Sequence, residues 1–391
     1  MAQLNIKPLA ATHMACTAAM MAFVAVIGPV ARAIHLAEWQ VGAVLTVGGV
    51  LWMLLSRPWG SMGDRQGRRK ALLAGTGGFI LSYGAMCALL VLALHTPLPN
   101  WMVFVGLMLT RGAVGAFYAA VPAVGQALIA DHLPADRRAK ALATVGAANG
   151  MGLVVGPAMA AALTQFSLVA PLLAIGLLPL LAFVLLRRSL PTSAPDTRSE
   201  RTQVRMTDAR LRRALAAAFV AMVCVYVAQV NVGFFALDRL GLAPHDAIGT
   251  AGSALTAVGV ALIGAQLAAR FIPLAPQRLL RLGALVSAAG FGCMPFAGTP
   301  VELVAFYFLA AAGMGWIFPS FAAMAANAVQ PREQGAAAGL VGAAQGMGVV
   351  AGPLVGTFLY QAGPGVPYAI ACVLLGLVAA WPGAAEGAGA D

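Results

Sequence analysis

Long apolar segments dominate this sequence. They recur from near residue 8 to near residue 382, and each approaches the roughly twenty residues that an α-helix needs to cross the hydrocarbon core of a bilayer. Of the 391 residues, 61% are hydrophobic and only 9% are charged, whereas a soluble domain usually has about 25% charged residues. A soluble fold of this size is therefore excluded, and the expected fold class is an all-α membrane protein.

Apolar length, with breaks at charged residues, Pro and Gly, predicts twelve transmembrane helices. The first has no convincing cleavage site behind it, so we interpret it as a membrane helix and not as a signal peptide. The expected helices cover residues 8–33, 40–59, 71–94, 101–126, 140–163, 168–187, 213–237, 245–269, 279–297, 301–327, 336–361 and 364–382.

The longest polar stretch lies between the sixth and seventh predicted helices and is rich in Arg, Ser, Thr and Pro. It has the composition of a linker. The expected domains are a six-helix bundle over residues 1–187, a cytoplasmic linker over 188–212 and a second six-helix bundle over 213–391.

Basic residues are concentrated in alternate loops. Of the 24 Lys and Arg residues, 21 lie before the first helix or in the even-numbered loops and the adjoining helix ends. This positive-inside pattern predicts that both termini are cytoplasmic. It also explains the net charge of +11 without a nucleic-acid partner. We therefore expect a multi-pass protein of a bacterial-type cytoplasmic (inner) membrane, in contact with the lipid bilayer.

The sequence contains an internal repeat. Residues 146–163 and 342–359 are identical at ten of eighteen aligned positions and lie 196 residues apart, half the chain length. They fall in the fifth and eleventh predicted helices, so the chain is expected to have two parallel, pseudo-symmetric halves. Transporters built in this way bind their cargo between the halves.

A Gly- and Arg-rich loop connects the second and third predicted helices. Residues 60–70 contain three glycines and one acid, Asp64, among several cations. Glycines let a helix approach its neighbour closely, and a cluster of ion pairs at helix ends can hold two elements together until the pairing changes. The corresponding loop of the second half has Ala268 in place of the Asp, so any such latch is asymmetric.

This loop closely resembles the loop signature of the major facilitator superfamily. The resemblance implies two six-helix bundles that rock about a central site, with a cytoplasmic gate at the loop. The fourth loop is also similar to that of the family, and one of its arginines is the expected partner of Asp64. The residues expected in the gate are Gly60, Gly63, Asp64, Arg65, Gly67, Arg68, Arg137 and Arg138.

Two further segments resemble patterns of this family. Arg111, deep in the fourth predicted helix, resembles the arginine of proton-coupled members; its role is either in a cavity or in bonding to helix carbonyls. A GxxxGP pattern in the fifth helix resembles the antiporter motif of drug:proton exporters, although Ala160 and Ala161 replace a glycine pair. The same pattern recurs in the eleventh helix and can also reflect the shared repeat. The residues expected in close helix packing are Gly152, Gly156, Pro157, Gly348, Gly352 and Pro353.

Charged side chains are scarce inside the predicted helices, and none of the thirteen acidic residues falls in the middle of one. Asp238, at the end of the seventh helix, is the best candidate for a titrating group; its alternative role is an ion pair with Arg239. Arg32 and Arg111 have no obvious carboxylate in the same half. If both face the cavity, the substrate should be anionic.

Neutral polar residues complete the candidate site. Asn149 and Gln345 occupy equivalent repeat positions, so they either form hydrogen bonds across the central interface or join neighbouring helices. The residues expected at the substrate or coupling site are Arg32, Arg111, Tyr118, Asn149, Gln229, Asn231, Asp238 and Gln345.

No signature of a hydrolase, metalloprotease or P-loop enzyme occurs in the sequence, and the five cysteines lie singly in apolar segments. We therefore expect no enzyme activity, no cofactor and no metal site. The resemblance implies a secondary active transporter that exports a small organic compound or drug by alternating access, with protons as the coupling ion. Nothing requires more than a monomer.

Two alternatives remain open at this point. The first is transport of an organic anion, such as a carboxylate metabolite or a carboxylate siderophore, in either direction; it rests on the two arginines and on the missing intramembrane carboxylate. The second is a sensor or scaffold with a transporter fold that moves nothing. The charge of the ligands that bind would separate the drug exporter from the anion transporter.

Overall fold

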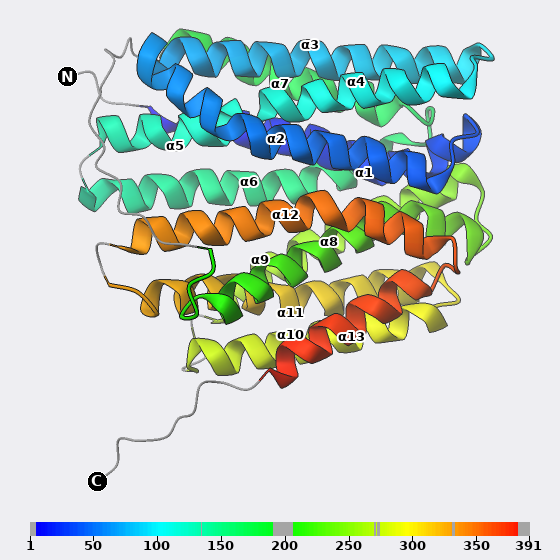
Figure 1. The fold of residues 1–391 in the computed structure, drawn as a ribbon. Helices are drawn as coiled ribbons and strands as arrows, with labels where there is room; N and C mark the ends of the chain where they lie inside the picture. Colours follow the sequence, from blue (N-terminus) through cyan, green and yellow to red (C-terminus); the bar gives the residue numbers. More distant parts are fainter. Residues whose placement is uncertain are drawn as a thin grey trace.

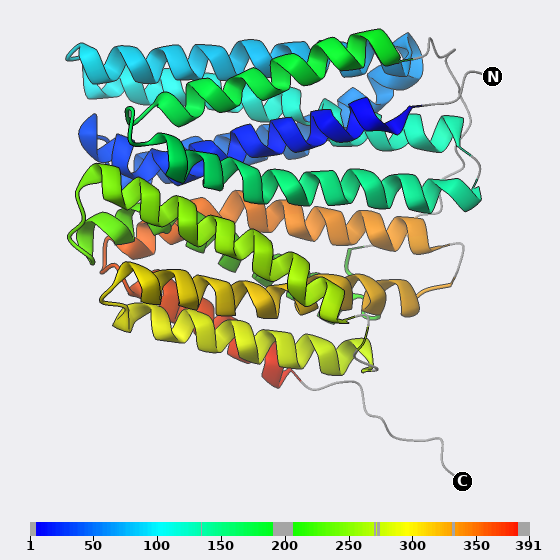
Figure 2. The ribbon, with the colours of Figure 1, turned by 180° about the vertical axis from the view of Figure 1, so that it is seen from behind.

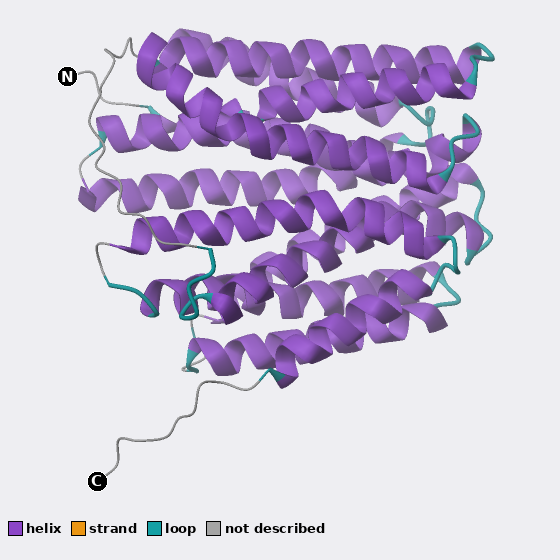
Figure 3. Ribbon diagram, in the orientation of Figure 1, coloured by secondary structure: helices purple, strands orange, loops and turns teal. Residues whose placement is uncertain are grey.

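The computed structural model describes residues 5–133, 135–190, 206–269, 271, 274–330 and 333–381, with side chains described in these ranges except for residues 135–140, 143 and 334–336. All regular structure in this part of the chain is helical. The helices run side by side along one common direction (Figures 1 and 3). The predicted all-α fold class is confirmed.

The helices of the first half lie together on one side of the molecule, and those of the second half lie on the other side (Figures 1 and 2). The first set is α1 (Ile6–Ala33), α2 (Glu38–Gln66), α3 (Arg68–His95), α4 (Asn100–Tyr118), α5 (Ala120–His132), α6 (Ala135–Leu163) and α7 (Ala170–Ser189). The second set is α8 (Arg212–Asp238), α9 (Pro244–Ala269), α10 (Pro276–Cys293), η1 (Met294–Phe296), α11 (Pro300–Asn327), α12 (Gln334–Tyr360) and α13 (Val366–Ala380).

The described residues contain eleven spans that are long and apolar enough to cross a membrane, and the shorter apolar helix α13 provides a twelfth. These positions agree with the twelve predicted helices. The expected linker, residues 188–212, lies largely outside the described residues, so the proposed domain boundaries stay a prediction. Below, the end of the molecule that carries the basic loops is called the predicted cytoplasmic end, and the opposite one the predicted periplasmic end.

The fourth span differs from its prediction. The sequence predicts one helix over residues 101–126, whereas α4 and α5 are separated at Ala119 and the span continues to His132. Pro122 explains the interruption: it has no N–H to donate, and its ring crowds the carbonyl of residue i−4, which is Tyr118. The change of direction therefore occurs just after Tyr118.

The repeated glycines pack the two halves in the same way. A methyl group at Gly152 on α6 would lie 2.6 Å from the carbonyl oxygen of Met14 on α1, and one at Gly348 on α12 would lie 2.7 Å from that of Phe219 on α8. At these positions only glycine lets the two backbones approach so closely. The repeat thus corresponds to two equivalent helix pairs, α1 with α6 and α8 with α12.

Helix α1 is buried along almost its whole length. It packs against α6 and α7 of its own half and against α8 and α9 of the other half. The polar side chains of Thr12, His13 and Thr17 on α1 are therefore directed into the protein and not into lipid. Helix α1 therefore contributes the surface of the first half that faces the second half.

Candidate functional site

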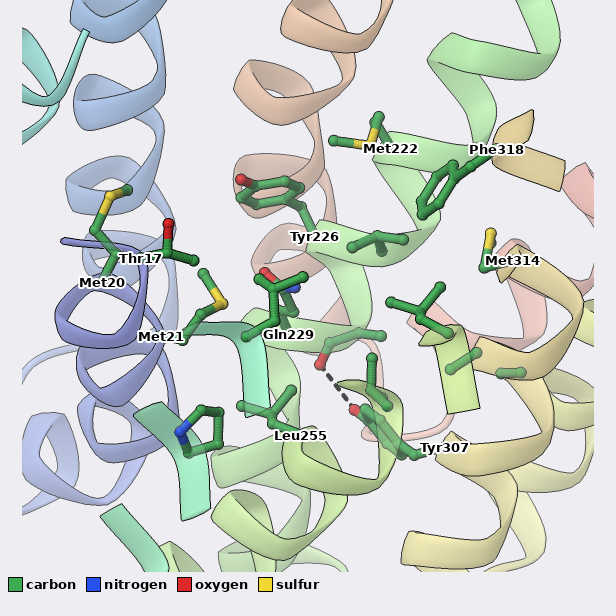
Figure 4. Close-up of a pocket in the computed structure, with 18 of the residues that line it drawn as sticks. Thr17, Met20, Met21, Met222, Tyr226, Gln229, Leu255, Tyr307, Met314 and Phe318 are labelled. Atoms are coloured by element: carbon green, nitrogen blue, oxygen red, sulfur yellow. Dashed lines mark hydrogen bonds between the residues drawn. The ribbon is translucent and has the colours of Figure 1, made fainter. Parts of the chain in front are cut away.

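A cavity of about 250 Å³ lies between the two halves. Its walls come mainly from the middle of α1 and α6 on one side and of α8, α9 and α11 on the other (Figure 4). None of the lining side chains, all within the described ranges, carries a formal charge. Four are methionines, which adapt to irregular apolar ligands: Met20, Met21, Met222 and Met314.

A few polar groups are set into this apolar wall. The hydroxyl of Thr17 on α1 donates to Oδ1 of Asn149 at 2.6 Å and lies 3.1 Å from the hydroxyl of Tyr118. Across the cavity, the hydroxyl of Tyr307 donates to the carbonyl of Ala228 at 2.7 Å (Figure 4). These groups are already satisfied by the protein, so they have little capacity left for a ligand.

Gln229 differs from its polar neighbours. It projects from α8 near the centre of the cavity (Figure 4), and its Oε1 is buried without a hydrogen-bond partner in the described part of the chain. A buried unsatisfied acceptor costs about 1–3 kcal/mol. Gln229 is therefore the lining residue with the strongest need for a donor from a ligand or a water molecule.

Arg111 lies beside this cavity and does not line it. It lines a side pocket of about 20 Å³ that shares Met20, Trp52 and Gln229 with the main cavity. Its guanidinium carbon is 5.6 Å from the centre of the Phe23 ring. Such a cation–π contact contributes about 0.5–2 kcal/mol, which is less than the several kcal/mol that burial of an ion costs.

A cluster of charges joins the two halves at the predicted periplasmic end. Nη2 of Arg32 on α1 is 2.5 Å from Glu38 of its own half and 2.7 Å from Oδ2 of Asp238 on α8. The hydroxyl of Tyr360 on α12 donates to the same oxygen of Asp238 at 3.0 Å. Within the described residues, this cluster contains the only ion pair that links α1 with α8.

Two expectations about this cluster are wrong. Arg32 does not lack a carboxylate in its own half, because α2 begins at Glu38 and places that side chain against it. Arg239 does not pair with Asp238 in the described part of the chain. It points away and donates to the carbonyl of Pro295 at 3.2 Å, since successive residues leave a helix in different directions.

The helices of the two halves also touch near the predicted periplasmic end. A methyl group at Gly28 on α1 would lie 3.1 Å from the backbone of Gly233 on α8. On the other side, Thr46 on α2 donates to the carbonyl of Val350 on α12 at 3.0 Å. Close backbone packing and the charge cluster thus close this end of the interface.

The predicted gate loop forms ion pairs within its own half. Arg68 is 2.5 Å from Asp64 and 2.8 Å from Asp131 at the end of α5. Gly67 has φ +94° and forms the turn between α2 and α3, a conformation that favours glycine. The side chains of Arg137 and Arg138, the expected partners of Asp64, lie outside the described residues.

The remaining gate glycines differ from each other. A methyl group at Gly63 would lie 3.1 Å from Nη1 of Arg68, whereas one at Gly60 would have nothing within 4 Å. The expected close packing at Gly60 is therefore wrong, because no neighbour among the described residues approaches that position, whereas Arg68 covers the helix one turn further on. Arg65 is exposed at the end of α2.

Of the other candidates, Asn149 bonds to Thr17 of its own half and joins α1 to α6. Gln345 lines a separate pocket of about 290 Å³ together with Phe318 and Val341. Asn231 is fully buried and donates to the carbonyl of Val227 at 2.9 Å. Of these three residues, only Asn149 lines the central cavity. Its hydrogen bond to Thr17 is a contact between helices of one bundle.

The sequence analysis missed several cavity residues. Thr17, Trp52 and the four methionines are ordinary residues of apolar helices, and no spacing distinguishes them from lipid-facing ones. Glu38 and Tyr360 were also missed as partners of Arg32 and Asp238. The sequence did contain one signal for Thr17. Three polar residues, Thr12, His13 and Thr17, lie close together in the apolar first helix, and all three are buried in the structure.

Comparisons with known proteins agree with this arrangement. A family model described as Major Facilitator Superfamily matches residues 9–301 and 274–384. The tetracycline resistance protein of class G from Vibrio anguillarum is 29% identical over 347 residues, 83% of this chain and 81% of that protein. The class C protein from Escherichia coli is 26% identical over 339 residues, 82% of this chain and 80% of that protein.

The fold also matches a solved structure. The crystal structure of a bacterial homologue of the human lysosomal transporter Spinster, in an inward-facing and unoccupied conformation, superposes with a TM-score of 0.72 at 15% identity. The match covers 96% of this chain and 95% of that chain. At this identity the likeness concerns the fold alone.

Proposed function

Because the chain belongs to the Major Facilitator Superfamily, and is thus a multi-pass membrane transporter, we propose that it exports a small, largely apolar organic compound in exchange for protons. The observation that carries this proposal is the uncharged cavity between the halves. A ligand there meets thioethers and aromatic rings, together with the Tyr226 hydroxyl and the Gln229 amide, whose Oε1 has no partner among the described residues. Such a pocket favours a compound of low net charge, since a buried unpaired charge is costly.

The relatives narrow the choice of a first cargo. Two tetracycline resistance proteins cover about four fifths of this chain at 26–29% identity. Tetracyclines are therefore the compound class to test first. The direction of transport proposed here, from cytoplasm to periplasm, also rests on these relatives and on the predicted antiporter motif.

For the coupling ion, we assign proton binding to the cluster of Arg32, Glu38, Asp238 and Tyr360. Two carboxylates share one arginine there, so the cluster has one negative charge more than it has positive ones. One bound proton would make the cluster neutral. If Asp238 takes the proton, Arg32 keeps its pair with Glu38 of its own half and the ionic link between the halves is lost.

The cytoplasmic gate is a second proposal at the other end. Arg68 holds Asp64 and Asp131, and we infer that the basic residues of the fourth loop, Arg137 and Arg138, compete for the same carboxylates during the transport cycle. Such an exchange of partners would hold and release the ends of the helices.

The organic-anion alternative is supported by Arg111 alone. This residue is buried next to the cavity and has no carboxylate partner in the described part of the chain. Arg32 no longer supports it, because Glu38 and Asp238 compensate its charge. An anionic cargo would therefore have to reach Arg111 through the side pocket.

A vesicle assay tests the proposed export. In everted membrane vesicles that contain the protein, an inward-acid pH gradient should drive accumulation of tetracycline, and a protonophore should abolish it. Gln229→Leu should reduce accumulation about tenfold, since it removes the free polar group of the cavity. Leu109→Ala, a change at an exposed position of α4, serves as the control and should transport normally. Accumulation that is unaffected by the protonophore would contradict proton coupling.

A further inference from the structure

Arg111 is a buried cation without a counter-charge in the described part of the chain. The residue is 5% exposed, and its Nε and Nη1 atoms have no hydrogen-bond partner among the described residues. No carboxylate of the described residues lies within ion-pair distance of it. Because a guanidinium stays charged in proteins, this burial calls for an acceptor that the described residues do not supply.

The side pocket next to Arg111 offers space for such an acceptor. Its volume of about 20 Å³ is enough for one particle of the size of a water molecule. Tyr226 and Gln229 on α8 line it from the other half of the protein, and Gly48 lines it from α2. Glycine at that position leaves room for the guanidinium, since a methyl group there would lie 2.8 Å from Nη1 of Arg111.

The polar groups around this pocket can all donate hydrogen bonds. Tyr226 can donate its hydroxyl proton. The Gln229 amide can turn its NH₂ group toward the pocket, because the oxygen and the NH₂ group of an amide are similar in size and exchange places when the amide flips. The Oε1 atom of Gln229 has no partner among the described residues in its present orientation, so the rotation breaks no hydrogen bond of that oxygen. Together with Arg111, the site has one positive charge and a surplus of donors.

We propose that this side pocket binds one small monovalent anion between Arg111 and the α8 residues Tyr226 and Gln229. A water molecule could accept hydrogen bonds there but would leave the charge of Arg111 uncompensated. The anion can come from two sources: it is either a free halide such as chloride or an ionised oxygen atom of the cargo. The second source requires that the proposed function is correct, whereas the first does not.

The pocket also links the anion to the cargo. It shares Met20, Met21, Trp52, Tyr226 and Gln229 with the main cavity. An anion in the side pocket therefore lies against the same side chains that the cargo touches. Because its ligands come from α4 of one half and α8 of the other, the anion also binds the two halves to each other.

A thermal-shift titration without cargo tests the first source. Purified protein in detergent is moved from sodium gluconate to sodium chloride at constant ionic strength, since gluconate is too large for the pocket. Chloride should raise the apparent Tm saturably by about 2–4 °C. Arg111→Gln should lose this rise, and Arg281→Gln, which changes an exposed arginine, should keep it. If Arg111→Gln does not fold, Arg111→Lys should need about tenfold more chloride, because the lysine loses the guanidinium fork.

A binding measurement in gluconate tests the second source. The probes are 2-naphthoate and its uncharged methyl ester. If the cargo supplies the anion, the protein should bind naphthoate at least about tenfold more tightly than the ester, and Arg111→Gln should remove this preference while Arg281→Gln keeps it. The proposal is overturned if wild-type protein shows neither a chloride-specific rise in Tm nor a preference for the acid. A chloride effect in a protein that moves no tetracycline would overturn the export proposal only.

Discussion

At the scale of single residues, the position of Arg32 between two carboxylates is the most informative feature. One partner, Glu38, belongs to the same half, and the other, Asp238, to the opposite half. Loss of the charge on Asp238 therefore does not leave Arg32 unpaired. Arg32 then keeps its pair with Glu38 and loses only its pair with Asp238. A contact that forms and breaks reversibly between two rocking bundles requires this property.

The substitution Asp238→Asn tests this arrangement. It retains the shape of the side chain but cannot exchange a proton, so we expect proton-driven export to fall at least about tenfold, with tetracycline binding changed less than about twofold. Equilibrium binding and vesicle accumulation measure the two quantities. Asp246→Asn is the matched control, because Asp246 lies in the exposed first turn of α9. Full proton-driven export by the Asp238→Asn protein would exclude Asp238 as the proton site.

A second residue-scale prediction concerns Thr17. The change Thr17→Val keeps the volume and removes the donor to Asn149. The free energy of unfolding should decrease by about 1–3 kcal/mol, since the amide oxygen of Asn149 is left without its donor. Thermal unfolding in detergent measures this change. Thr96→Val, outside the helices after α3, should have little effect; equal effects of the two changes would contradict the role given to Thr17.

At the scale of helices, the repeated glycines set how closely α6 approaches α1. A methyl group at Gly156 would overlap the carbonyl oxygen of Ala18, whereas one at Gly146 on the same helix would meet nothing within 4 Å. The two glycines therefore look alike in the sequence and differ in the structure. Only the first is required by a neighbouring backbone.

These two positions provide a matched pair of variants. Gly156→Ala should lower the free energy of unfolding by about 1–3 kcal/mol through overpacking, and Gly146→Ala should raise it by about 0.5–1 kcal/mol, because alanine favours the helix. Denaturation monitored by circular dichroism measures the change in the free energy of unfolding for both variants. A Gly156→Ala protein as stable as wild type would show that α1 and α6 can separate without cost.

At the scale of the whole molecule, the contact between α2 and α12 closes the predicted periplasmic end. A methyl group at Gly42 would overlap the side chain of Thr357 and lie 2.8 Å from the carbonyl oxygen of Pro353. This contact can form only when the halves are together at this end. A larger side chain at Gly42 should therefore destabilise the present conformation relative to one that opens there.

The variant Gly42→Ala should shift the population toward the conformation open at the predicted periplasmic end. Spin labels placed at the ends of α2 and α12 measure the distance across this interface, and we expect the population with a long distance to rise about tenfold, which corresponds to about 1.4 kcal/mol. Gly84→Ala, on α3 with nothing among the described residues within 4 Å of an added methyl group, is the control. Unchanged distances in the Gly42→Ala protein would exclude this contact as part of the closure.

The sequence predicted the architecture well because the bilayer restricts a chain of this composition to long helices. Apolar length located the twelve spans, and the repeat identified the fifth and eleventh of them as equivalent, whereas their partners α1 and α8 became known only from the structure. The site was harder to predict. Two glycines three residues apart on one helix, such as Gly60 and Gly63, are distinguished only by the neighbours that surround them. The pairing of Arg32 with Asp238 joins residues 206 positions apart in the chain, and no local pattern contains that information.

The methionine wall of the cavity has a consequence for cells under oxidative stress. Oxidants convert a thioether into a polar, chiral sulfoxide, and methionine sulfoxide reductases reverse the reaction. Oxidation of Met20, Met21, Met222 or Met314 would turn a surface suited to apolar compounds into one that retains water. We expect hypochlorite treatment to reduce export in proportion to the sulfoxide content found by mass spectrometry, and reductase treatment to restore it. If the chain exports drugs as proposed above, a cell exposed to both an oxidant and a drug would lose this export until the methionines are reduced again.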